Sequence, residues 1–201
     1  MNKKIIGTFA TLCALILTTS PAHALLDMKA LYGSYTGTSG TKSGYGVEMS
    51  LPILPVGIGA MVVEDSVAIN FTISGTSFTA GTYKGYLAPA YVYFNFGIPF
   101  VPVSLKARGG YSLFMPTSGP VSNVSSFVLP GGVYYDVVAI YSMPLLPFIG
   151  AYAEVGYANL ILNVAEGLKT LGASDAQLSG ASIQNRNYAG MTWKAGISIG
   201  I

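Results

Sequence analysis

The proline pattern Pro-x-x-Pro occurs three times in this chain, each time inside an apolar stretch of six residues. The stretches are Leu51–Val56, Ile98–Val103 and Met143–Phe148, and their first prolines are 47 and then 45 residues apart. Proline has no N–H for a β-ladder and a fixed φ that suits turns, so each stretch predicts a tight turn between strands. The predicted turns are built on Pro52, Pro55, Pro99, Pro102, Pro144 and Pro147. Three equivalent turns indicate a meander of eight strands.

The segments that flank these turns alternate between apolar and polar residues, which is typical of strands with two different faces. In the last segment, Trp193 and Ile197 share an apolar face, while Lys194 and Ser198 lie on the opposite face. We expect Pro89 near the start of the fourth strand, where proline is tolerated. The predicted strands lie near residues 29–37, 45–52, 57–65, 86–98, 103–113, 133–143, 148–158 and 188–201. Long polar loops are predicted at 38–44, 66–85, 114–132 and 159–187.

The composition favours a transmembrane β-barrel over a soluble β-sandwich. Only 9% of the 201 residues are charged and 51% are apolar, whereas soluble domains carry roughly 25% charged residues. The second face holds small and charged side chains, unlike the inner layer of a sandwich. In lipid the apolar face turns outward and the sheet must close, because unpaired backbone groups at an edge are costly there. We therefore predict an all-β, eight-stranded antiparallel up-and-down transmembrane β-barrel, with short periplasmic turns and long extracellular loops. A soluble periplasmic β-sandwich is the alternative fold.

The N-terminus has the pattern of a secretory signal peptide. Lys3 and Lys4 precede the apolar run from Ile5 to Leu17, and Ala22-His23-Ala24 supplies a small-x-small cleavage site. We predict cleavage after residue 24, which leaves 25–201 as the barrel domain; an uncleaved anchor is the alternative. Removal of two of the ten basic residues leaves eight, equal to the number of acidic residues. A neutral mature chain gives no electrostatic case for binding nucleic acid.

These features resemble those of the small eight-stranded outer-membrane proteins, the class that includes the OmpA transmembrane domain, OmpX and OmpW. The turns also resemble those of an uncharacterised family of small Gram-negative outer-membrane proteins. The C-terminal segment is similar to the assembly signal of such barrels, through Lys194, Gly196, Ile199 and Ile201, although it ends in isoleucine rather than an aromatic residue. The resemblance implies export through the Sec pathway, the outer membrane as location, and outer-membrane lipid and the barrel-assembly machinery as partners. A monomer is expected.

The predicted inner face gathers three acidic and three basic side chains. They are Glu48, Asp136, Glu154, Lys106, Arg108 and Lys194. An eight-stranded barrel is just wide enough for its own side chains, so we expect a salt-bridged structural plug rather than an open pore. A gated, porin-like path for small polar solutes is the functional alternative.

The residue types that remain argue against catalysis. His23 and Cys13 both lie in the predicted signal peptide, so the mature chain lacks the usual general base and thiol. No cofactor and no metal site are predicted; Glu64 and Asp65 are weighed as calcium ligands but interpreted as solvated carboxylates. Tyrosines near predicted strand ends indicate interfacial girdles rather than a ligand-stacking surface. They are Tyr32, Tyr45, Tyr91, Tyr111, Tyr141, Tyr157 and Tyr188, together with Trp193.

The predicted function is therefore a non-enzymatic one, in envelope structure or in surface interaction through the extracellular loops. The alternative is an OmpW-like conduit or binding barrel for small hydrophobic molecules, with loops 159–187 and 66–85 as its walls. Loop 159–187 is expected to contain a short amphipathic helix, which acts as an extracellular lid, forms a hydrophobic entry site like that of OmpW-type barrels, or packs on the rim as an ordinary loop. Its apolar residues are Leu160, Ile161, Leu162, Val164 and Leu168.

Overall fold

The computed structural model describes residues 26–51, 54–70, 80–98, 101–120, 128–170, 172–180 and 185–201. The predicted signal peptide, Pro52 and Pro99 lie outside these ranges.

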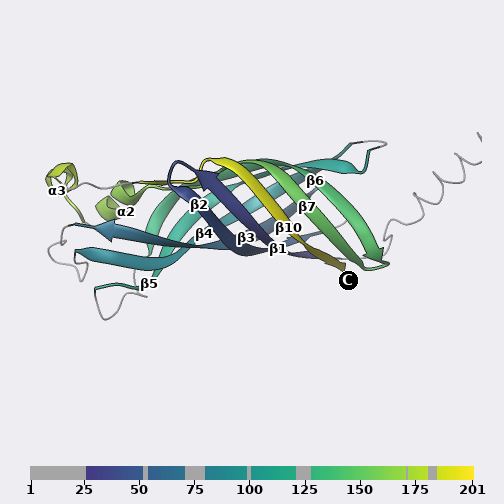
Figure 1. The fold of residues 1–201 in the computed structure, drawn as a ribbon, viewed down its shortest axis with the longest axis horizontal. Helices are drawn as coiled ribbons and strands as arrows, with labels where there is room; N and C mark the ends of the chain where they lie inside the picture. The colour runs from purple at the N-terminus through teal and green to yellow at the C-terminus, as the bar shows by residue number, and fades with distance from the viewer. Residues whose placement is uncertain are drawn as a thin grey trace, which may run out of the picture.

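Eight antiparallel strands close into a single barrel (Figure 1). Around the barrel their order is β1-β10-β7-β6-β5-β4-β3-β2, so neighbours in sequence are neighbours in space and the ends of the chain close the sheet. The closing pair runs from Asp27↔Gly200 to Tyr35↔Thr192. The fold is therefore the predicted all-β, up-and-down eight-stranded barrel. The strands are β1 (Asp27–Gly37), β2 (Gly40–Ser50), β3 (Val56–Ile69), β4 (Gly81–Gly97), β5 (Val103–Ser118), β6 (Leu129–Leu146), β7 (Ile149–Asn159) and β10 (Gly190–Gly200).

The described residues of the three Pro-x-x-Pro stretches all lie at one end of the barrel, which we call the short-turn end. In the first two, an i→i+3 hydrogen bond closes the turn, from Leu54 N–H to Leu51 O (3.0 Å) and from Val101 N–H to Ile98 O (3.3 Å). The third differs from our prediction, because β6 runs through Pro144 to Leu146 and the turn begins at Pro147. A register shift between Pro144 and Leu146 explains how a proline fits there, since a bulge tolerates a missing N–H.

The opposite end, which we call the long-loop end, departs from the prediction in three loops. The predicted loop 38–44 is a tight hairpin, with the β1–β2 ladder paired as far as Gly37↔Gly40. Gly40 has a φ of 99°, the left-handed conformation that a residue bordering such a turn can require. The predicted loops 66–85 and 114–132 were also too long, because β4, β5 and β6 have 17, 16 and 18 residues. These strands extend beyond β1, β2, β7 and β10, which have 11 residues each.

Pro89 was predicted near the start of the fourth strand, but it lies in the middle of β4. It lies inside β4 with its side chain buried, opposite Ser112 of β5, rather than at the rim. The β3–β4 pairing is recorded at Ala60↔Ala90 and again at Val63↔Leu87, and is interrupted between them. Pro89 has no N–H to donate, and the interruption includes this residue. The β3–β4 ladder therefore accommodates the proline where strand pairing is absent.

The connection between β7 and β10 folds back over the long-loop end. It contains β8 (Ile161–Leu162), α2 (Val164–Thr170), α3 (Asp175–Gly180) and β9 (Arg186–Asn187). The predicted short helix is therefore present, and Figure 1 shows α2 and α3 at one end of the barrel. Within the described ranges, no helix has the length and apolar character needed to cross a membrane.

Candidate functional site

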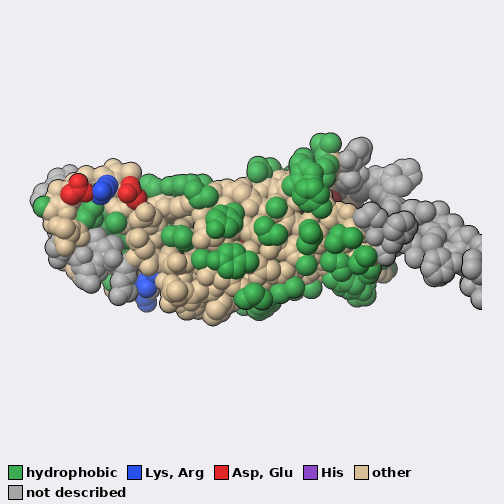
Figure 2. Space-filling model, turned by 90° about the horizontal axis from the view of Figure 1, so that it is seen from above, with side chains coloured by type: hydrophobic (Ala, Val, Ile, Leu, Met, Phe, Trp, Pro, Cys, Tyr) green, Lys and Arg blue, Asp and Glu red, His purple; other side chains and the backbone are tan. Residues whose placement is uncertain are grey.

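Apolar side chains cover the outside of the barrel. In the described strands that form it, the outward-facing charged residues are Glu64 and Lys84, both toward the long-loop end. Below them the outer surface carries exposed valine, isoleucine, leucine, phenylalanine and tyrosine side chains, seen as green patches in Figure 2. A water-soluble surface would intersperse charges among such residues. The outer wall thus has the chemistry of a lipid-facing barrel.

Of the eight aromatic residues predicted to form girdles, six face outward and two do not. Tyr32 packs against Tyr45 and Trp193 on the outer surface, with ring centroids 5.1 and 5.8 Å away. Tyr91 and Tyr188, by contrast, point into the barrel and are 4% and 1% exposed. Both donate hydrogen bonds to buried carboxylates, Tyr91 to Glu48 and Tyr188 to Asp65.

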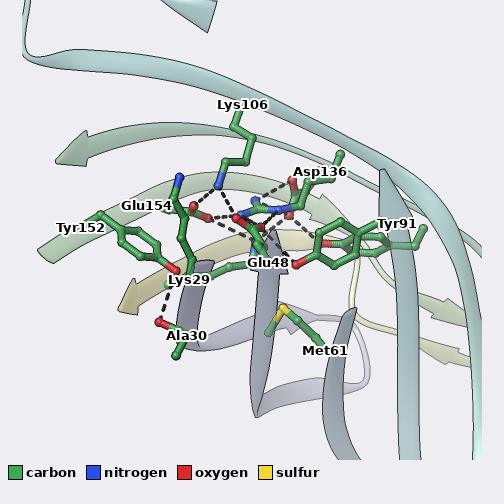
Figure 3. A network of polar contacts seen from close by, with 12 residues as sticks. Lys29, Ala30, Glu48, Met61, Tyr91, Lys106, Asp136, Tyr152 and Glu154 are labelled. Carbon is green, nitrogen blue, oxygen red and sulfur yellow. Dashed lines mark hydrogen bonds and ion pairs between the residues drawn. The ribbon is translucent and has the colours of Figure 1, made fainter. Parts of the chain in front are cut away.

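The six charged residues predicted to face inward meet in the middle of the lumen. We call Glu48, Lys106, Arg108, Asp136, Glu154 and Lys194 the central charge cluster. They come from five different strands, and all six side chains are fully buried. Figure 3 shows Glu48, Lys106, Asp136 and Glu154 converging from opposite walls. With three carboxylates and three cations, the cluster is neutral.

Arg108 is the centre of the cluster because its guanidinium reaches all three carboxylates. Its Nη1 donates to both oxygens of Asp136 at 3.0 and 3.1 Å, and its Nε donates to Glu48 at 2.8 Å. Its Nη2 donates to Glu154 at 2.6 Å and lies 2.6 Å from Glu48. The planar five-donor fork of arginine suits such multiple recognition, which the point charge of lysine could not provide.

The two lysines complete the neutralisation. Lys106 Nζ lies 2.7 Å from Glu48 and 2.8 Å from Glu154, so it bridges two carboxylates. Lys194 Nζ lies 2.5 Å from Asp136 and 4.0 Å from Glu154. Each carboxylate therefore faces at least two cations. Such pairing makes burial of six charges tolerable in an apolar surrounding.

Tyrosine rings surround the cluster. Tyr134 donates to Asp136 at 2.6 Å, and its hydroxyl lies 3.3 Å from that of Tyr35. Tyr91 donates to Glu48 at 3.1 Å, and its ring centroid lies 5.5 Å from Arg108 Cζ. These rings supply both hydrogen bonds to the carboxylates and aromatic faces to the cations. The lumen at this level is filled by side chains, so it has the geometry of a plug.

Above the cluster, toward the long-loop end, the lumen becomes apolar. Leu87, Phe114 and Leu129 point inward from the tall strands and are fully buried. Val164 and Leu168 of α2 and Leu162 of β8 pack in the same core. The β7–β10 connection therefore packs its own apolar side chains in the core, with α2 against β6 and β8 against β5 and β6.

Polar contacts fasten this connection to β3 across the mouth; we call Asp65, Ser66, Arg186 and Tyr188 the latch. Arg186 donates to the Ser66 carbonyl from Nε (3.1 Å) and Nη2 (2.7 Å). Tyr188 donates to Asp65 at 2.9 Å. Burial, followed by the charge of Asp65, raises the pKa of Tyr188, so its hydroxyl stays protonated and able to donate.

Replacing Tyr188 by phenylalanine removes the hydrogen bond to Asp65 and leaves the shape of the ring. We expect the free energy of local opening of the connection to fall by about 1 kcal/mol, which is the usual contribution of one such hydrogen bond. Hydrogen exchange should show it as faster exchange of the Tyr188 amide, which donates to Leu160 O at 2.9 Å. Tyr157→Phe, on the half-exposed outer surface, is the matched control. Equal exchange rates of the Tyr188 amide in both variants would show that the hydrogen bond to Asp65 does not hold the connection in place.

The residues weighed as calcium ligands do not form a site. Glu64 is exposed on the outer face, whereas Asp65 faces inward and pairs with Lys42 at 3.5 Å. Adjacent residues of a strand point to opposite faces, which separates the two carboxylates. In the described part of the chain, no group of three or more histidine, cysteine or acidic residues is arranged to hold a metal ion.

No protein-family model matches this chain, and no curated protein sequence matches it. Among solved structures it is similar to the crystal structure of Neisserial surface protein A, with a TM-score of 0.45 and 13% sequence identity. The alignment covers 88% of this chain and 96% of that chain. The barrel is defined by the strand pairing of this chain, in which β1 and β10 close the sheet.

Proposed function

We propose that this protein is a non-enzymatic outer-membrane barrel with a closed lumen, whose role in the envelope or in surface interaction is carried by the long-loop end. The observation that carries the proposal is the contrast between the two faces of one closed sheet. The outer face is apolar below Glu64 and Lys84, and the inner face is filled by the central charge cluster. A soluble barrel needs the opposite arrangement.

The orientation and the biogenesis follow from the same proposal. The short-turn end faces the periplasm and the long-loop end faces outside, as in bacterial barrels of this kind. Lys194, Gly196, Ile199 and Ile201 lie on or directly after β10, the strand that closes the barrel. We assign to them the signal read by the barrel-assembly machinery, after export by the Sec pathway and removal of residues 1–24. The mature protein is a monomer in this account.

A closed lumen has a direct electrical test. The purified protein, reconstituted in planar bilayers, is expected to show no stable conductance steps, because Arg108 and its three carboxylate partners span the middle of the lumen as buried ion pairs. Fractionation should place it in the outer membrane, with heat-modifiable mobility on gels. A persistent open channel in the wild-type protein would contradict the plug, and recovery in the soluble periplasm would contradict the barrel in lipid.

A binding barrel for small hydrophobic molecules is the second candidate. It is favoured by the apolar upper lumen, where Leu87, Phe114 and Leu129 belong to the same buried cluster as Val164 and Leu168 of α2. Opening of the β7–β10 connection would expose this surface to an apolar solute. Titration with an aliphatic alcohol such as decanol tests it: saturable binding that becomes tighter in Tyr188→Phe supports the candidate, and partition without saturation argues against it.

A further inference from the structure

A cavity of about 440 Å³ lies at the short-turn end of the barrel. Its polar wall consists of residues from β1, β2 and β4, namely Asp27, Lys29, Ser50, Tyr93 and Asn95. Lys106 Nζ lies 4.8 Å from the centroid of the Tyr93 ring, so the cavity borders the central charge cluster without including any of its members.

The other wall is apolar and comes from the first Pro-x-x-Pro stretch. Leu51, Leu54 and Pro55 line it, and both leucines are 49% exposed, so the cavity communicates with the surface. The Asn95 N–H donates to Pro55 O at 2.7 Å and ties this turn to β4. The turn thus holds an apolar surface opposite a polar one.

Two polar atoms of the cavity wall are buried, the hydroxyl of Tyr93 and Oδ1 of Asn95. The Tyr93 hydroxyl interacts with the side chain of Ser50, and Asn95 Oδ1 has no hydrogen-bond partner within the described ranges. Tyr93 is 4% exposed. Buried polar atoms are normally paired, so the free acceptor of Asn95 in the same cavity as the Tyr93 hydroxyl indicates a place for a polar ligand. A tyrosine hydroxyl can donate, and an amide oxygen accepts.

The charges at the cavity are balanced. Asp27 Oδ2 lies 3.3 Å from Lys29 Nζ, and the two side chains are 26% and 15% exposed. A ligand with a single charge would meet one attractive and one repulsive group. A ligand with a neighbouring cation and anion would satisfy both groups, as complementary charge pairs do.

We propose that this cavity binds a free α-amino acid with an apolar side chain. The ligand carboxylate accepts from Lys29 and from the Tyr93 hydroxyl. Its ammonium donates to Asp27 and to Asn95 Oδ1, and its side chain packs on Leu51 and Leu54. The site is separate from the long-loop end, so the ligand proposal does not depend on the surface role proposed above.

Calorimetric titration of the purified full-length mature protein in detergent micelles tests the ligand class. L-leucine is the probe, and leucinamide and N-acetyl-leucine each lack one of its charges. We expect saturable binding of leucine and roughly tenfold weaker binding of both analogues, because each loses a charge-assisted hydrogen bond. Equal heats for all three compounds, or no saturation up to about 10 mM leucine, would overturn the proposal.

Variants locate the site. Lys29→Gln and, independently, Asn95→Leu are each expected to weaken leucine binding by about tenfold. Lys42→Gln is the matched control, because Lys42 forms a partly exposed ion pair with Asp65 at the other end of the barrel. Unchanged heat-modifiable mobility shows that each variant is folded. If the folded variants bind leucine like the control, the ligand is not in this cavity and the proposal fails.

Discussion

Replacement of Arg108 by methionine is expected to lower the free energy of unfolding by about 3–5 kcal/mol. The guanidinium contacts Glu48, Asp136 and Glu154 at 3.1 Å or less. Methionine keeps much of the side-chain volume but leaves three buried carboxylates with two lysines, and an unpaired buried charge is strongly unfavourable. Urea titration in lipid vesicles, followed by Trp193 fluorescence, measures the change.

Two controls separate charge balance from packing in this experiment. Lys169→Met removes an exposed ion pair with Asp175 and should leave the free energy of unfolding nearly unchanged. Adding Asp136→Asn to Arg108→Met restores equal numbers of buried cations and anions, so part of the lost stability should return. A loss below about 1 kcal/mol in Arg108→Met, or a further loss in the double variant, would contradict the proposed role of the cluster.

The second large effect is expected at Gly59, where a tyrosine ring lies against the backbone. A Cβ at this position would lie 2.6 Å from Cε2 of Tyr91 and 2.9 Å from Cγ of Glu48. The Tyr91 ring cannot move away freely, because its hydroxyl donates to Glu48. We therefore expect Gly59→Ala to cost about 1–3 kcal/mol, the usual range for overpacking.

Gly109→Ala is the matched control, since a Cβ there would meet nothing within 4 Å. Its effect should stay within about 0.5 kcal/mol. In a Tyr91→Ala background the clash is gone, so the added cost of Gly59→Ala should fall toward that of the control. Urea titration of the wild type, Gly59→Ala, Tyr91→Ala and the double variant gives the coupling energy between Gly59 and Tyr91. A cost that is independent of Tyr91 would show that the ring does not restrain Gly59.

The eight strands and the inward direction of the six cluster residues could be predicted because both depend on a period of two. Once the apolar face is assigned to the outside, Arg108, Asp136 and Lys194 must lie inside. The same rule applied to β4 would have placed Tyr91 inside as well, since Val92 and Phe94 lie on the apolar face. The prediction instead grouped Tyr91 with the aromatic residues of the girdles.

Other features have no periodic signal. The lengths of β5 and β6 beyond the predicted strands depend on pairing between distant segments such as Phe114↔Leu129. The latch joins Asp65 to Tyr188, which are 123 residues apart in sequence. The pattern of Leu160, Leu162 and Leu168 indicated an amphipathic segment, but whether it packs in the lumen or on the rim is decided by the tertiary fold.

Quenching of the fluorescence of Trp193 shows whether lipid covers the barrel wall, because the chain contains one tryptophan and it lies 49% exposed on the outer face of β10. In vesicles, lipids brominated along the acyl chain should quench this fluorescence strongly, while aqueous iodide should have little effect. Efficient quenching by iodide, with no effect of the brominated lipids, would show that water rather than lipid covers the barrel wall and would contradict the account.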